Sequence, residues 1–185
     1  LLLLAGAPVE GGIGLRIFVA MPLPEGTVEE MKPWLGRQRR SWPDLRWVRD
    51  QQLHLTVRFL GDITDAALDE LLRLLGATPF EESPFVIDDT GSFGQRVPGG
   101  LPSVYWISGS FGSQVGRMAE LLSRVPDDRG RVDRRSFRPH ITIARQGTSG
   151  SRATLDPPGP WSGVLSRTVV YNSTLTREGP VYEAV

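Results

Sequence analysis

Both histidines of this chain lie in the same short pattern: a His, an apolar residue, a Thr and a second apolar residue. The first copy starts at His54 and contains Thr56, and the second starts at His140 and contains Thr142. Alternate side chains of a β-strand share one face, so each imidazole and hydroxyl point the same way while the apolar pair anchors the strand in the core. If two such strands come together, two imidazoles and two hydroxyls surround a common point.

These four groups suit acid–base attack on a phosphodiester. A neutral imidazole takes a proton from water, and a protonated imidazole gives one to the leaving oxygen. The threonine hydroxyls donate hydrogen bonds to non-bridging phosphate oxygens. Histidine fits both roles because its ordinary pKa, about 6.5, lets both protonation states coexist near neutral pH.

The composition narrows the alternatives. With no Cys, the chain lacks thiol nucleophiles, disulfides and cysteine metal sites, and two His are too few for a zinc site of three imidazoles. Ligation of a metal by both His and nearby carboxylates remains an alternative, although no DxD or ExxH element lies near either motif; we expect no metal and no cofactor. A net charge of zero argues against bulk electrostatic coating of DNA.

Strand-like and helix-like segments mix along the chain without the regular long crossovers of a doubly wound sheet. Helices are expected from Thr27, from Thr64 or Asp65 to Gly76, and over 115–125. Apolar and alternating segments predict strands at 16–20, 45–48, 53–60, 85–87, 104–107, 141–144 and 164–175. The two motifs are separated by nearly half the chain, as expected for a duplicated unit. We therefore predict an α+β fold of two similar lobes.

The start of the sequence is expected to lie outside this fold. Residues 1–14 begin with four Leu, which are too few for a signal sequence or a membrane span, and are expected to be a disordered or vector-derived extension. Residues 15–185 are expected to form a single bilobal domain. No run of about 18 apolar residues follows, so we expect a cytoplasmic protein that does not insert into a membrane.

The chain resembles the 2H phosphoesterase superfamily, and within it the bacterial and archaeal RNA 2′,3′-cyclic phosphodiesterases, historically called 2′-5′ RNA ligases. The doubled motif is specific to the superfamily, and the resemblance covers residues 15–185. Its flanking segments are Arg16-Ile-Phe-Val-Ala-Met-Pro-Leu-Pro, Arg46-Trp-Val, His54-Leu-Thr-Val-Arg-Phe-Leu-Gly, Phe137-Arg-Pro-His-Ile-Thr-Ile-Ala-Arg145 and Gly179-Pro-Val-Tyr-Glu183.

The resemblance implies two pseudo-symmetric lobes of mainly antiparallel sheet, with flanking helices, around a central cleft, and catalysis without a metal. RNA ending in a 2′,3′-cyclic phosphate would be opened to a 2′-phosphate. By this resemblance His54 is the proton donor, His140 the proton acceptor, and Thr56 and Thr142 hold the phosphate. Arg145 would contact the phosphate or the terminal base.

Arg58 shares strand parity with the first His and Thr, so it is predicted to reach the cleft as a further substrate-binding residue.

The expected partner is an RNA or oligonucleotide end, bound by a monomer. Ligation through a 2′-5′ bond is an alternative physiological direction, because microscopic reversibility uses the same groups. A third interpretation is a non-catalytic module that binds nucleotides or RNA ends.

Overall fold

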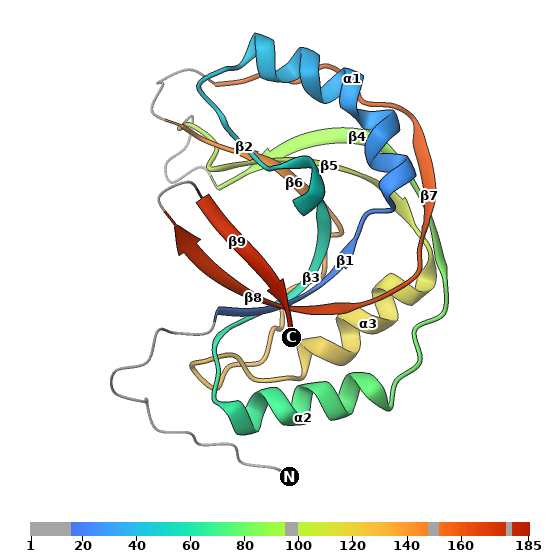
Figure 1. The fold of residues 1–185 in the computed structure, drawn as a ribbon, viewed down its shortest axis with the longest axis vertical. Helices are drawn as coiled ribbons and strands as arrows, with labels where there is room; N and C mark the ends of the chain where they lie inside the picture. Colours follow the sequence, from blue (N-terminus) through green and yellow to red (C-terminus); the bar gives the residue numbers. More distant parts are fainter. Residues whose placement is uncertain (1–15, 95–99, 148–151, 177–178) are drawn as a thin grey trace.

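A curled sheet of nine strands, with three helices packed around it, forms the described part of the chain (Figure 1). The computed structural model describes residues 16–94, 100–147, 152–176 and 179–185. The helices are α1 (Glu25–Ser41), α2 (Asp65–Gly76) and α3 (Ser113–Ser123), with a short 3₁₀ turn at Asp50–Gln52. The strands are β1 (Arg16–Pro22), β2 (Arg46–Trp47), β3 (His54–Asp62), β4 (Ser83–Phe93), β5 (Val104–Phe111), β6 (Ile141–Arg145), β7 (Trp161–Leu165), β8 (Val169–Thr176) and β9 (Gly179–Ala184).

The order of the strands places the two motif strands side by side. The sheet runs β7-β4-β5-β6-β3-β1-β8-β9, and the short β2 pairs with β6. The pairings are antiparallel, which confirms the predicted α+β class with a mainly antiparallel sheet. β3 and β6 meet at the centre of the sheet, where Leu55 pairs with Ile141.

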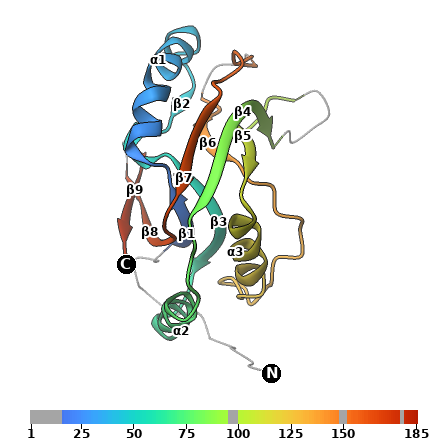
Figure 2. The ribbon, with the colours of Figure 1, turned by 90° about the vertical axis from the view of Figure 1, so that its right-hand side faces the viewer.

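The two halves of the sheet repeat one connection. β1 leads through α1 to β3, and β5 leads through α3 to β6; each pair of strands is antiparallel. The helices then cross to the other half, because α3 packs against β3 and α1 against β7. On α1, Trp34 meets Trp161 edge to face at 5.5 Å between ring centroids. The two pseudo-symmetric halves therefore interlock around one continuous sheet, with α1 at one end and α2 and α3 at the other (Figures 1 and 2).

The core lies on the face of the sheet opposite the motif His and Thr. Val19, Leu55, Ile107 and Ile141 come from the four central strands and are fully buried there. The apolar positions of both motifs thus anchor their strands as the alternation predicts. Helix α2 also matches its prediction, since the Thr64 hydroxyl caps it by accepting from the backbone N–H of Ala67 at 3.3 Å.

Helix α1 begins earlier than the sequence pattern predicts. It starts at Glu25 and continues through Pro33, which supplies no N–H to the helix. Thr27 is not the cap: its buried hydroxyl donates to the carbonyl of Ser162 at 3.4 Å. The contact with β7 thus decides the conformation of this residue in place of the local capping pattern.

The long strand predicted over 164–175 is wrong, because the structure divides it into two strands. β7 pairs with β4 at one edge of the sheet, and β8 pairs with β1 in the opposite half. The interruption falls on Ser166, Arg167 and Thr168, which lack apolar side chains to hold a central strand. Strand β9, which begins with Gly179 and Pro180, was not predicted, because such residues usually mark a turn.

Residues 1–14, for which an extension was expected, lie outside the described residues. Of the helices in the described ranges, none combines the length and the apolar character needed to cross a membrane.

Candidate active site

The first motif strand contains a bulge directly after its Thr. Against β1, Thr56 pairs with Ala20 and Arg58 pairs with Val19. Val57 is therefore left between them without a partner of its own. Two residues of β3 thus oppose one residue of β1, which is the defining feature of a β-bulge.

The second motif strand contains the same irregularity at the same place. Against β5, Thr142 pairs with Trp106 and Ala144 pairs with Tyr105, so that Ile143 is the extra residue. The duplication visible in the sequence therefore extends to the hydrogen-bonding pattern. In both copies the fourth residue of the motif is the bulged one.

A bulge reverses the face on which the residues that follow it lie, up to the next irregularity of the strand. In β3 that next irregularity comes after Phe59. Four positions after each His, Arg58 and Ala144 point to the core face. Five positions after each His, Phe59 and Arg145 turn to the face that carries the His and Thr. The ring of Phe59 confirms this placement, since its centroid lies 5.7 Å from that of Phe18, a neighbour of the His54 ring.

The four motif side chains gather around the central pair of Leu55 and Ile141. Residues on either side of a paired residue point to the opposite face of a sheet. The His and Thr of both motifs consequently share one face where β3 and β6 meet. All four are partly accessible to solvent: His54, Thr56, His140 and Thr142.

Both imidazoles are held by equivalent hydrogen bonds. Nδ1 of His54 lies 2.6 Å from the carbonyl oxygen of Gln52, and Nδ1 of His140 lies 2.7 Å from that of Arg138. A carbonyl only accepts, so each Nδ1 carries the hydrogen in the neutral ring. Each Nε2 is then left to exchange a proton with a ligand.

Aromatic side chains support both imidazoles. The ring of His54 packs against Phe18, at 5.2 Å between centroids, and against Tyr182, which meets it edge to face at 5.4 Å. His140 meets Phe93 edge to face at 4.9 Å, and Phe93 in turn contacts Trp106. Together with the backbone hydrogen bonds, these contacts fix the orientation of both rings before any ligand binds.

The two histidines differ in their electrostatic surroundings. Burial lowers the pKa of His54, the Gln52 carbonyl opposes this by raising it, and the positive charge of Arg145 lowers it further. Burial raises the pKa of Tyr182, while Arg145 again opposes the shift. The positive charge of Arg145 thus acts on the imidazole of His54 and on Tyr182, which packs against that imidazole, as expected for a residue that the bulge turns to this face.

A second arginine lies beside Arg145. Arg46 on β2 is its direct cross-strand partner, and the Nε of Arg46 donates to the carbonyl of Gln146 at 3.2 Å. Neither guanidinium forms an ion pair with an acidic side chain of the described residues. Like charges directly opposite one another are unfavourable in a sheet, so this pair favours an anion nearby.

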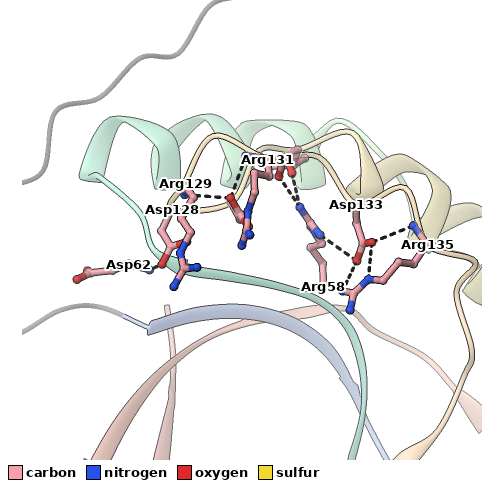
Figure 3. Close-up of polar contacts among 9 residues, drawn as sticks. Arg58, Asp62, Asp128, Arg129, Arg131, Asp133 and Arg135 are labelled. Atoms are coloured by element: carbon pink, nitrogen blue, oxygen red, sulfur yellow. Dashed lines mark hydrogen bonds and ion pairs between the residues drawn. The ribbon is translucent and has the colours of Figure 1, made fainter. Parts of the chain in front are cut away.

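The prediction that Arg58 reaches the cleft is wrong. Its side chain is 7% exposed and lies on the core face, because the bulge at Val57 reverses the strand parity. Its Nη2 donates to the carbonyls of Val125 and Arg131, each at 3.0 Å, and its Nη1 forms an ion pair with Asp133 at 3.1 Å (Figure 3). Arg58 therefore holds the segment that leads from α3 toward the second motif.

Further contacts fasten this segment to the end of β3 (Figure 3). The backbone N–H of Asp128 donates to the carbonyl of Leu60 at 2.7 Å, and the Oδ2 of Asp128 accepts from the backbone N–H of Asp62 at 3.3 Å. The side-chain hydrogen bond from Arg131 lowers the pKa of Asp127 to about 2. Within the segment, Asp127 thus pairs with Arg131 and Asp133 with Arg135.

Two features of the site were not predicted from the sequence: a role for Arg46, and an aromatic wall beside the two imidazoles, formed by Phe18, Phe93, Trp106 and Tyr182. Phe18 and Trp106 read as ordinary apolar residues of their predicted strands at 16–20 and 104–107. Tyr182 belongs to β9, which was not predicted, although the residue stands in one of the segments that resemble the superfamily. Arg46 likewise opens one of those segments, but nothing in the local pattern predicts a role for its side chain.

The described residues contain no cluster of three or more His, Cys, Asp or Glu arranged to hold a metal ion.

A family model described as LigT-like phosphoesterase matches residues 22–102. An RNA 2′,3′-cyclic phosphodiesterase of Aquifex aeolicus is 30% identical over 149 residues, which cover 76% of this chain and 79% of that protein.

Two further similarities extend the comparison. A Geobacillus stearothermophilus protein, also named RNA 2′,3′-cyclic phosphodiesterase, is 28% identical over 132 residues. That match covers 70% of this chain, which spans only 41% of the relative's length. The crystal structure of E. coli LigT complexed with 3′-AMP is 26% identical with a TM-score of 0.72, over 93% of this chain and 95% of that one.

Proposed function

The chain belongs to the LigT-like phosphoesterase family, and from that premise we propose that it hydrolyses RNA 2′,3′-cyclic phosphate ends to 2′-phosphates. The observation that carries the proposal is the matched pair of imidazoles. Each has its Nδ1 tied to a backbone carbonyl two residues earlier and a Thr two residues later on the same face. A module that only binds RNA needs no such matched acid and base.

The proposed reaction adds water across one phosphorus–oxygen bond. The Nε2 of His140 takes a proton from the attacking water, whose oxygen forms a bond to phosphorus. The bond from phosphorus to the 3′ oxygen breaks, and the protonated Nε2 of His54 gives its proton to that oxygen. The product is a 2′-phosphate beside a free 3′ hydroxyl.

The other site residues stabilise the negative charge of the phosphate. The hydroxyls of Thr56 and Thr142 donate to the non-bridging phosphate oxygens, where negative charge increases during attack. Arg145 binds the phosphate or the terminal base. The bound phosphate also raises the pKa of the half-buried His54, because a nearby negative charge favours the imidazolium. Binding of the substrate therefore prepares the proton donor.

The test is incubation of the purified protein, in EDTA, with an oligonucleotide that ends in a 2′,3′-cyclic phosphate. We expect a 2′-phosphate product, and a loss of about 10²–10⁴-fold in kcat when either His54 or His140 is replaced by Ala. Tight binding without turnover would instead establish the non-catalytic module.

The same assay also tests whether the protein hydrolyses or ligates RNA ends, and whether it acts as a monomer. Excess RNA with a free 5′ hydroxyl allows 2′-5′ ligation, in which that hydroxyl takes the place of water and the 3′ oxygen again leaves, to be measured beside hydrolysis. We also propose that the protein acts as a monomer, because one chain supplies both motifs and the residues that surround them. Activity that rises more than linearly with protein concentration would contradict this.

A further inference from the structure

The two bulges place different residues at equivalent positions of the two halves. Five residues after its His, the second motif presents Arg145 and the first presents Phe59. The proposed reaction uses Arg145 but gives Phe59 no role. Phe59 is nevertheless 63% exposed on the face that carries the motif His and Thr.

Phe59 continues the aromatic wall of the active site. Phe18 is the cross-strand partner of both Phe59 and Tyr171, so three rings form a row across β3, β1 and β8. Their centroids are 5.7 and 5.3 Å apart, and Phe18 in the middle is only 2% exposed. One neighbour of Phe59 is thus a rigidly packed ring, while most of its own surface meets solvent.

The position of this ring sets which part of a substrate it can meet. The His54 and Phe59 centroids lie 5.2 and 5.7 Å from that of Phe18, so Phe59 is at most about 11 Å from His54. The cyclic phosphate is carried by the terminal ribose of the RNA. The preceding nucleotide is attached through the 5′ oxygen of that ribose, so its base lies across the ribose from the cyclic phosphate, at a distance on the scale of this separation.

We propose that Phe59 is a stacking platform for the base next to the terminal nucleotide, so that the enzyme binds RNA ends better than single cyclic nucleotides. This proposal rests on the proposed function of the site. A phenylalanine ring stacks on any base because every base has a π-face, so recognition is tolerant of sequence. The ring needs no hydrogen-bond partner, and it already lies in contact with the wall that supports His54.

The difference between Phe59 and Arg145, which occupy equivalent positions in the two halves, also favours one orientation of the bound RNA. A pseudo-symmetric site with identical arms would accept RNA equally well in two orientations. Here one arm is aromatic and suits a base, whereas the other is cationic and suits a phosphate. The asymmetry favours the orientation in which the neighbouring base passes over β3.

The experiment compares two substrates that end in the same nucleotide: a mononucleotide 2′,3′-cyclic phosphate and an oligonucleotide with the same end. Phe59→Ala should lower kcat/KM for the oligonucleotide about 5–100-fold, as expected for loss of one stacked base, mainly through KM. Turnover of the mononucleotide should be unchanged. Phe59→Trp should restore the preference, and Leu72→Ala, which alters an exposed apolar residue of α2, should affect neither substrate.

A spectroscopic readout tests the stacking itself. 2-Aminopurine as the second base from the end of an uncleaved oligonucleotide ending in a 2′-phosphate should lose fluorescence on binding to the wild type, and less with Phe59→Ala. The dissociation constant of the same complex should rise by the factor seen in kcat/KM. An abasic residue at that position should weaken binding by the wild type and leave Phe59→Ala unaffected.

The outcomes separate this proposal from the hydrolysis proposal. If neither substrate is turned over but Phe59→Ala still weakens oligonucleotide binding, hydrolysis is wrong and the platform stands. If both substrates are turned over and Phe59→Ala changes them by the same factor, or changes neither, the platform is wrong. Unchanged 2-aminopurine fluorescence on binding would also overturn it.

Discussion

Leu55 and Ile141 pair across β3 and β6 at the centre of the sheet, and each stands between the His and the Thr of its motif. Both side chains are fully buried. This contact joins the two halves of the fold at the point where their functional groups meet. The relative position of the two imidazoles therefore depends on how well this pair packs.

Replacement of Leu55 by Ala should affect both stability and catalysis. We expect a loss of about 2–5 kcal/mol in the free energy of unfolding, as for other buried Leu→Ala changes, measured by denaturant titration. The turnover number should fall as well, because the motif strands can shift. Leu165→Ala is the matched control: Leu165 is equally buried, but on the edge strand β7, so stability should fall with little change in kcat. Equal kcat values for both variants would contradict a positioning role for the central pair.

The hydroxyls of the motif threonines should matter more than their methyl groups. Thr56→Val keeps the shape but removes a donor to the phosphate, and loss of one such donor costs about 10²–10³-fold in kcat. Thr56→Ser keeps the hydroxyl and should retain most of the rate. The same pair of variants at Thr142 should behave alike, because the two motifs are structurally equivalent. A steady-state assay of the four variants tests this, and a Val variant as active as its Ser counterpart would count against phosphate binding.

The titration of His54 should respond to Arg145. Because the positive charge of Arg145 lowers the pKa of His54, Arg145→Gln should raise that pKa, whereas Arg145→Lys should leave it lowered. The chain has only two histidines, so NMR titration of the imidazole signals gives two curves, and His140→Gln assigns them. Inorganic phosphate should also raise the pKa of His54, because it brings a negative charge to the site. A pKa that stays constant in Arg145→Gln would place the guanidinium away from this imidazole.

The two arginines located just after the motifs should give opposite phenotypes. Arg58→Ala removes the donor to the carbonyl of Val125 and the ion pair with Asp133, and leaving a buried polar group unsatisfied costs about 1–3 kcal/mol. The carbonyl of Arg131 loses one donor but still accepts from the backbone N–H of Asp127. We expect a lower melting temperature with an almost unchanged KM. Arg145→Ala should instead raise KM and leave the melting temperature nearly unaltered, since its side chain is exposed. A raised KM in Arg58→Ala at a temperature where the variant is fully folded would contradict its purely structural role.

Much of the chemistry could be predicted from the sequence because it depends on residue types and local alternation. The pairing of His54 with Thr56 and of His140 with Thr142 on one face needs only the two-residue period of a strand, which held up to the end of each motif. The apolar residues between them mark the core face for the same reason. The Thr64 cap and the amphipathic pattern after it likewise predicted α2 nearly to its ends, since both signals lie within the helix itself.

The tertiary structure decided the orientation of the residues beyond each motif. The bulges at Val57 and Ile143 arise from hydrogen bonding with β1 and β5, strands distant in the sequence, and no local pattern announces them. They turn Arg58 into the core and bring Phe59 and Arg145 to the active face. Long-range pairing also sends β7 and β8 to opposite halves of the sheet and brings Tyr182 beside His54. A strand's local period describes which residues share a face only while the pairing is regular; where the partner strand skips a residue, the partner decides.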